Sequence, residues 1–460
     1  MPARWIRVAP AAALEDDFEA IRREAGVPDA FSADALAEAE RAAAATPRPA
    51  GERLELPFVT IDPPGSRDLD QAVHIERTGD GHRVRYAIAD VGAFVADGGG
   101  VARDAHERGV TVYAPDRKVP LHPEALSEGA ASLLPGQWRP AVVWTLDLDG
   151  AGELMSAQVG RAEVRSVAQH TYADVPPELE PLLREVGERR LARERDRGAI
   201  RLNVPEQEVA REGDSWTVSY RVPLPTEEWN AQVSLLTGMA AAQLMLRSGV
   251  GILRTQPHAD DKALRRLRRQ ALALRVDWPA DLPYAEFLRR LDPALPAHAA
   301  LMQEATGVGH GAGYTAFDGE PPAEPEHFAI AAAYAHATAP LRRLQDRYVS
   351  ECCLAACEGS TPPDWVRVAL PGLPEAMAAG DRRARAVERG VVDLVEAVLL
   401  SGREGERFDA VVIDDRVVQL SEPAVRGKVE GECPEPGVAV SVRLVRADPA
   451  RRAVLFASTP

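Results

Sequence analysis

Three aspartates lie close together in the segment FVTIDPPGSRDLDQAVHIER, residues 58–77. Asp62 ends an apolar run typical of a strand, the residues PPGSR favour a turn, and Asp68 and Asp70 follow two positions apart. Because side chains two apart on a strand share a face, we expect Asp68 and Asp70 to point together, with the turn bringing Asp62 back towards them. Clustered carboxylates repel one another unless a cation neutralises them, and such oxygen ligands select Mg²⁺ or Mn²⁺. The spacing predicts a divalent-metal site, with an Asp-rich turn capped by its own backbone as the alternative.

The surrounding sequence predicts an α+β fold to position this cluster. Strand-like pieces dominate residues 54–165 and helical patterns dominate residues 225–400, which indicates one large mixed domain over residues 51–400. Residues 1–50 carry apolar residues at helical spacing, so we expect a small helical element there, compatible with a helix-turn-helix. Residues 401–460 give about five short strands separated by Gly, Pro and Asp, the pattern of an OB-type barrel.

Composition limits the function classes. Hydrophobic residues make up 45% and charged residues 27% of the 460 residues, which excludes a disordered or coiled-coil protein. The net charge of −16 repels polyanions at long range, so a nucleic-acid site has to be a local field. Only Lys118, Lys262 and Lys428 are lysines among the 54 basic residues, which we assign to a GC-rich genome. Since no apolar run approaches the ~20 residues that a bilayer crossing requires, we expect a cytoplasmic protein with no membrane partner.

Four segments resemble, in order, the catalytic RNB domain of the ribonuclease II family: IDPPGSRDLDQAV, YAIADVGAFV, VTVYAPDRKVPLHPEALSEGAASLLPG and HFAIAAAYAHATAPLRRLQDRYV. The resemblance covers about residues 55–400, and the C-terminal pattern is similar to the family's S1-like RNA-binding domain. It implies an enzyme that binds single-stranded 3′ ends of RNA and removes nucleoside 5′-monophosphates with Mg²⁺ or Mn²⁺. No protein partner is indicated.

By resemblance, Asp62, Asp68 and Asp70 match three residues of the family's four-aspartate metal site, and Gln71 stands at the fourth position. A glutamine oxygen can bind a metal but brings no charge, so we expect one weakened metal position that favours Mn²⁺. Asp90 is either a replacement carboxylate or a turn residue. The alternative is a catalytically silent RNA-binding protein that kept the fold, and a hydrolase of small phosphoesters is a weaker rival.

The resemblance also assigns residues to RNA. Arg342 matches the arginine on the scissile phosphate, and the adjacent Arg343 is either a phosphate contact or a helix-face charge. Tyr113 matches the aromatic that stacks on the 3′-terminal base, although a half-buried strand tyrosine is the alternative. The second aromatic of that clamp falls on Leu202, so we expect a looser grip on the base.

Three further positions follow from the same resemblance. Tyr172 and Glu227 match contacts to the ribose, where a carboxylate that accepts from a 2′-hydroxyl favours RNA over DNA, and Glu228 is a neighbouring alternative. Glu388 matches an acidic residue beside the terminal nucleotide. We expect the family's N-terminal cold-shock barrels to be absent and access for structured RNA to differ.

Overall fold

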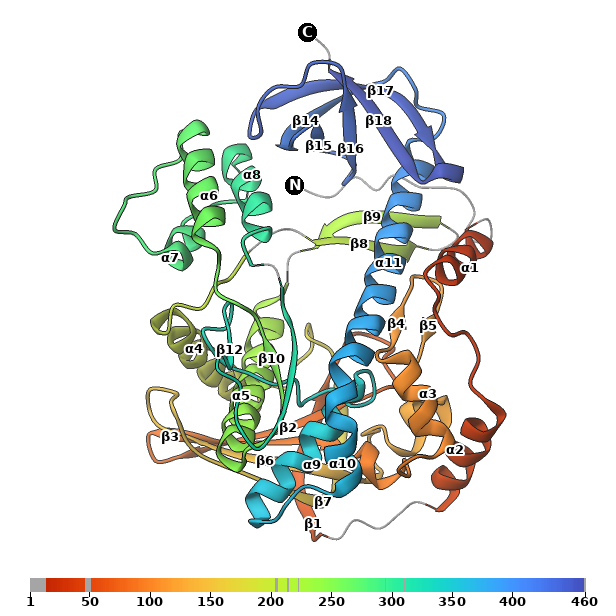
Figure 1. The fold of residues 1–460 in the computed structure, drawn as a ribbon, viewed down its shortest axis with the longest axis vertical. Helices are drawn as coiled ribbons and strands as arrows, with labels where there is room; N and C mark the ends of the chain where they lie inside the picture. The colour runs from red at the N-terminus through yellow and green to blue at the C-terminus, as the bar shows by residue number, and fades with distance from the viewer. Residues whose placement is uncertain are drawn as a thin grey trace.

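The protein is described by a computed structural model that covers residues 14–45, 51–202, 206–212, 215–221, 223–293, 295–309 and 311–458. Figure 1 shows a lower body built around one barrel and a second barrel above it, with a long helix, α11 (Leu373–Leu400), running between them. Within the described ranges, no helix is both long enough and apolar enough to cross a membrane.

The lower body contains a closed barrel of five strands in the order β1-β2-β3-β6-β7. Neighbouring strands are antiparallel except β1 and β7, which are parallel. The 17-residue β7 closes the barrel because its first part pairs with β6 and its last part pairs with β1. The strands are β1 (Arg53–Ile61), β2 (Gln71–Thr78), β3 (Gly81–Ala89), β6 (Trp138–Leu148) and β7 (Leu154–His170).

Two hydrophobic cores cover this barrel. The larger joins residues of the barrel, such as Tyr86 and Trp144, to several helices, of which three contribute much of the packing. These are α4 (Glu180–Asp196), α5 (Pro225–Ser248) and α9 (Leu344–Glu358). The other core joins the barrel to α2 (Ala33–Ala45), α3 (Gly100–Arg108) and the π-helical turn η3 (Ala125–Ala130). The barrel is therefore held between packed helices, which fixes the ends of its strands.

Four two-stranded ribbons and a helical insertion complete the lower body. The insertion lies between β10 and β11 and has its own small core around Leu267, Phe287 and Leu301. Its helices are α6 (Asp261–Ala273), α7 (Tyr284–Arg289) and α8 (Pro296–Thr306). The ribbons are β4 (Val112–Tyr113) with β5 (Lys118–Val119), β8 (Glu206–Glu212) with β9 (Ser215–Arg221), β10 (Val250–Thr255) with β11 (Gly313–Asp318), and β12 (Glu326–His327) with β13 (Ala332–Ala333). The short helix α10 (Asp364–Ala369) precedes α11.

The upper body is a second closed barrel, in the order β14-β15-β16-β18-β17. Only β16 and β18 are parallel, and this is the OB arrangement that the sequence predicted. Its strands are β14 (Arg407–Asp414), β15 (Val417–Leu420), β16 (Arg426–Glu430), β17 (Ala439–Asp448) and β18 (Ala453–Ser458). Apolar residues of α11 share one core with this barrel. The predicted α+β class with a C-terminal five-stranded barrel is confirmed.

The N-terminal region contributes two described helices. Phe18 and Ile21 of α1 (Glu15–Glu24) belong to the core shared with α11, and the Phe18 ring meets Trp216 edge-on at 5.3 Å between centroids. In contrast, α2 packs on α3, and Figure 1 shows the two helices apart. This placement gives a helix-turn-helix no support.

Candidate active site

The connection between β1 and β2 brings the acidic residues together. The Asp62 N–H donates to the His170 carbonyl at 3.0 Å, and Ser66 N–H closes a turn onto the Pro63 carbonyl at 3.2 Å. Gly65 has a φ of +82°, which a glycine adopts without strain. Contrary to the sequence prediction, Asp68 and Asp70 precede β2 and do not lie in it. Leu69 between them is fully buried and anchors this irregular segment.

Asp62 has an unsatisfied carboxylate. Its Oδ2 is buried and has no hydrogen-bond partner in the described part of the chain. Burial raises the pKa of Asp62 to about 7, the charge of Asp68 adds to this effect, and Arg342 opposes it. A buried acceptor in a field of like charge is a suitable place for a cation.

Asp68 faces the β4–β5 ribbon. Its Oδ1 lies 2.6 Å from the Lys118 ammonium, and its Oδ2 accepts from the Tyr113 hydroxyl at 3.3 Å. Lys118 also reaches Glu128 at 2.8 Å. Although burial lowers the pKa of Lys118, its hydrogen bonds to the two carboxylates raise it overall, so the amine is charged. Tyr113 and Lys118 are paired across the ribbon, and the Tyr113 side chain remains 52% exposed, which leaves ring surface for a ligand.

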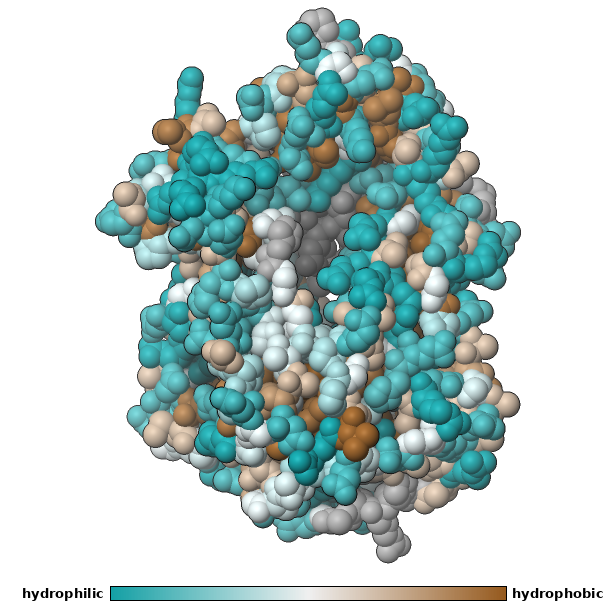
Figure 2. Space-filling model, viewed as in Figure 1, coloured by the Kyte–Doolittle hydropathy of each residue, from teal (hydrophilic) through white to brown (hydrophobic). Residues whose placement is uncertain are grey.

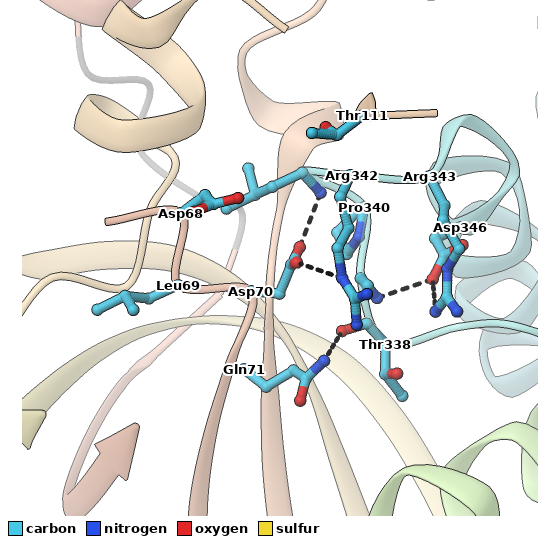
Figure 3. Close-up of polar contacts among 12 residues, drawn as sticks. Asp68, Leu69, Asp70, Gln71, Thr111, Thr338, Pro340, Arg342, Arg343 and Asp346 are labelled. Atoms are coloured by element: carbon cyan, nitrogen blue, oxygen red, sulfur yellow. Dashed lines mark hydrogen bonds and ion pairs between the residues drawn. The ribbon is translucent and has the colours of Figure 1, made fainter. Parts of the chain in front are cut away.

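Asp70 is the most buried of the three aspartates, at 4% exposure. Its Oδ1 accepts from the Leu341 N–H at 2.8 Å, and its Oδ2 lies 3.5 Å from Arg342 Nε (Figure 3). Burial raises the pKa of Asp70 to about 7, in spite of the opposing effects of Arg342 and the Leu341 amide. The fold therefore holds a carboxylate where ionisation is costly.

Residues 338–346 place Arg342 beside the aspartates. The Arg342 carbonyl accepts from the Thr111 N–H at 2.9 Å, which ties it to the segment leading to Tyr113. Asp346 accepts from the Ala339 N–H at 2.7 Å and from two nitrogens of Arg343 at 2.8 and 3.0 Å. The Arg342 side chain is 45% exposed, so part of its guanidinium is open to a ligand. The Arg343 guanidinium is used in the pair with Asp346, and its contact with RNA stays a prediction.

The Gln71 amide is engaged at both ends. Its Nε2 donates to the Thr338 carbonyl at 2.6 Å (Figure 3). Its Oε1 accepts from the Tyr86 hydroxyl at 2.6 Å. This arrangement gives no support to Gln71 as a neutral metal ligand. The Asp90 carboxylate, considered as a replacement, is buried in an ion pair with Arg161 at 2.8 Å.

The predicted ribose contacts lie near the same charges. Burial raises the pKa of Tyr172, and the negative charges of Asp62 and Glu227 raise it further. Glu227 accepts from the Leu224 N–H at 3.3 Å at the start of α5, while Glu228 pairs with Arg201 at 2.9 Å. The structure thus brings Tyr172 and Glu227 towards the acidic cluster.

A separate hollow of about 800 Å³ lies between α8, α11 and the C-terminal barrel. Figure 2 shows the surface hollowed below that barrel, with hydrophilic residues on both sides. Leu202 and Glu388 line it, so the structure places them together. Its walls also carry four cationic side chains, Arg385, Arg389, Arg426 and Lys428. Three carboxylates, Glu388, Asp393 and Glu396, line the same hollow, so its lining carries one more positive than negative charge.

In the part of the chain that the structure describes, no three His, Cys, Asp or Glu side chains are arranged to hold a metal ion. Asp68 is paired with Lys118, and Asp70 is paired with Arg342. Of the three aspartates, Asp62 alone has a buried oxygen without a hydrogen-bond partner among the described residues.

Sequence reasoning overlooked two contributors to the site. Lys118 lies in the resembling segment PDRKVP, and its rarity among arginines was the available signal. The other contributor is the pair of hydrogen bonds that Gln71 makes with Tyr86 and Thr338. Thr338 is far from Gln71 in sequence, and no local sequence pattern predicts either bond.

The structure thus defines a two-barrel α+β protein that has three aspartates and a half-exposed arginine at one end of its lower barrel. The RNB domain model matches residues 53–358, and the RNase II-type exonuclease C-terminal S1 domain model matches residues 406–459. The chain therefore belongs to the RNB, or ribonuclease II, family.

Named relatives agree with this assignment. Ribonuclease R of Aquifex aeolicus is 28% identical over 81% of this chain and 56% of its own length, and Exoribonuclease 2 of Aeromonas hydrophila is 26% identical over 78% and 56%. The chain thus spans about half the length of these curated relatives.

Solved structures share the fold. Mycoplasma genitalium RNase R in complex with ribose methylated single-stranded RNA has a TM-score of 0.85 at 18% identity, covering 96% of this chain and 78% of that one. Yeast Ssd1, a pseudonuclease, has a TM-score of 0.68 at 14% identity, covering 91% and 53%. The fold is therefore shared by a protein named as a ribonuclease and by one named as a pseudonuclease.

Proposed function

We propose that this protein is an exoribonuclease that hydrolyses RNA from the 3′ end and releases nucleoside 5′-monophosphates. The observation that carries the proposal is the meeting of Asp62, Asp68 and Asp70 with Arg342 and the exposed ring of Tyr113. Such a site has groups for a phosphate, for a base and for cations within one small region.

The phosphate contact falls to Arg342. Its Nε faces Asp70, and it makes no other ion pair within the described ranges, so the rest of its exposed guanidinium is available for a non-bridging phosphate oxygen. Negative charge grows on those oxygens when water attacks phosphorus and the 3′-oxygen of the preceding nucleotide leaves. A fixed guanidinium stabilises that charge more than it stabilises the substrate, which lowers the barrier.

The terminal nucleotide would be held by residues around this point. The Tyr113 ring accepts any base by stacking, which suits an enzyme that removes nucleotides without regard to sequence. Tyr172 and Glu227 would contact the ribose, where an acceptor for the 2′-hydroxyl distinguishes RNA from DNA. The four cationic side chains of the hollow beneath the C-terminal barrel would contact phosphates of the upstream single strand.

Mg²⁺ or Mn²⁺ would be held by Asp62 and Asp68, with Asp70 beside them. The unpartnered Oδ2 of Asp62 and the oxygen-only donor set fit a hard divalent cation. When bound, such an ion supplies activation of water and charge neutralisation at the phosphate. The aspartates' own task would be to present carboxylate oxygens to that ion from one short segment of the chain.

The test uses the full chain with RNA labelled at either end. Stepwise shortening of 5′-labelled RNA, early release of a labelled 5′-mononucleotide from 3′-labelled RNA, and inhibition by EDTA support the proposal. Asp70→Asn should abolish shortening. Asp318→Asn, at an exposed pair with Arg367, makes the same chemical change and should not.

Two results would refute the proposal. Retention of RNA without shortening would indicate a binding protein that kept the fold, and preference for mononucleotide model esters would indicate a small phosphoesterase.

A further inference from the structure

Gln71 joins parts of the active site that are far apart in sequence. It lies at the start of β2, its Nε2 donates to the Thr338 carbonyl at 2.6 Å, and its Oε1 accepts from Tyr86 of β3 at 2.6 Å. The Tyr86 hydroxyl also lies 3.0 Å from Ser234 Oγ on α5. Tyr86 is 1% exposed, so this network lies within the protein.

Asp70 and Gln71 bind the same segment, residues 338–341, through hydrogen bonds of opposite direction. The Asp70 carboxylate accepts from the Leu341 N–H, whereas the Gln71 amide donates to the Thr338 carbonyl three residues earlier (Figure 3). An ionised acid at position 71 would have no hydrogen to donate and would set its oxygen against the carbonyl oxygen of Thr338. The amide is therefore the group that this geometry requires.

We infer that Gln71 is a positioning residue, which fixes the segment carrying the Leu341 amide and the Arg342 guanidinium against Asp70. This inference rests on the proposed exoribonuclease function. It assigns to Gln71 a task different from that of a weakened metal ligand.

The hydrogen bond from Gln71 to Thr338 would act by holding the Arg342 segment in place. Arg342 lies four residues after Thr338, and its side chain approaches Asp70 at only 3.5 Å through one nitrogen. The segment is tied on its other sides by the bonds from Ala339 to Asp346 and from Thr111 to the Arg342 carbonyl. Releasing the Gln71 bond would let the segment move, and a displacement of ~1 Å at a reacting group can cost about 100-fold in rate.

The test compares three variants in the full chain at saturating Mg²⁺ or Mn²⁺. Gln71→Met keeps the volume and removes both hydrogen bonds, and we expect kcat to fall about 10- to 100-fold while KM for RNA changes less than about threefold. Gln71→Asp, which restores the family's acidic residue, should lower kcat at least as much. Tyr86→Phe removes one oxygen atom and should lower kcat by about fivefold; it decides the matter if Gln71→Met does not fold.

A second measurement does not depend on activity. Hydrogen exchange of the peptide covering residues 338–343 should become faster in Gln71→Met, because the amides of Ala339 and Leu341 lose a fixed neighbour. Gln256→Met is the matched control, since Gln256 likewise uses both amide ends, donating to the Gly309 carbonyl and accepting from the Ala329 N–H. In that control, exchange at residues 338–343 and kcat should stay as in the wild type.

The outcomes are distinct. A Gln71→Asp variant with higher kcat, or with a lower Mg²⁺ requirement, overturns the inference and restores the ligand interpretation. Unchanged kcat and unchanged exchange in Gln71→Met also overturn it. A wild-type protein that does not shorten RNA refutes the proposed function instead, and the exchange experiment still tests the positioning.

Discussion

Replacing Asp70 by asparagine should remove activity and yet stabilise the fold. Asp70 is 4% exposed, and its pKa is raised from 3.8 to about 7 by burial, against the attraction of Arg342. This shift corresponds to roughly 4 kcal/mol of unfavourable ionisation above pH 7. The pKa of about 7 already includes the attraction of Arg342. An asparagine keeps an acceptor for the Leu341 N–H but buries an amide NH₂ beside Arg342, which has no acceptor to offer, at a cost of about 1–3 kcal/mol. We expect a net gain of about 1–3 kcal/mol at pH 8.

The pH dependence of this gain follows from the sign of the shift. Between pH 3.8 and 7 the folded chain keeps a proton on Asp70 that the unfolded chain releases, so wild-type stability falls as the pH rises through this window. The advantage of Asp70→Asn should therefore be largest near pH 8, smaller at pH 5 and absent below about pH 4. Urea unfolding in EDTA at these pH values measures it, because a bound cation would neutralise the carboxylate.

Asp346 offers the matched control. It is fully buried, but its carboxylate accepts from the Ala339 N–H, from Arg343 and from Gln345. Asp346→Asn should therefore destabilise the protein by about 3 kcal/mol. In the activity assay, Asp70→Asn should lower kcat on the order of 1000-fold. Lower stability of Asp70→Asn than of the wild type at pH 8 would refute the reasoning about its buried charge, and retained activity would refute its role.

Three further changes test the surroundings of the site. Lys118→Met removes the ammonium beside Asp68, so Mn²⁺ binding measured by titration calorimetry should tighten about tenfold, and weaker binding would contradict this reasoning. Tyr113→Ala removes the exposed ring and should raise KM for oligoribonucleotides about tenfold with less change in kcat; an unchanged KM would exclude stacking there. Exchanging Arg385 and Lys428 for glutamine should reduce the slope of log KM against log salt by about 0.7 for each lost phosphate contact, whereas an unchanged slope would place the RNA elsewhere.

The C-terminal barrel and the alternating strands could be predicted from sequence because their signals are local. A strand repeats its apolar residues every second position, and Gly, Pro or Asp marks its ends. The pattern of residues 401–460 therefore predicts about five strands. The closure of β1–β7 into a barrel could not be predicted in this way. It depends on the long β7 pairing with two strands, one of them about 110 residues away in sequence.

For the candidate site as well, the sequence determined some features and the tertiary structure determined others. The order of Asp62, the turn, Asp68 and Asp70 is a property of the chain, and this spacing predicts a divalent-metal site with acidic ligands. The sequence alone could not assign partners to those carboxylates. Lys118 reaches Asp68 from 50 residues away, and the segment with Leu341 and Arg342 reaches Asp70 from about 270 residues away.

The same distinction explains Gln71. In the sequence, the neutral Gln71 stands at the position where the family resemblance implies an acid. Whether the amide faces a metal or a carbonyl is decided by packing, because Thr338 and Tyr86 approach it only in the folded barrel. Local order along the chain thus determined which groups are present, whereas tertiary contacts decided what each of them binds.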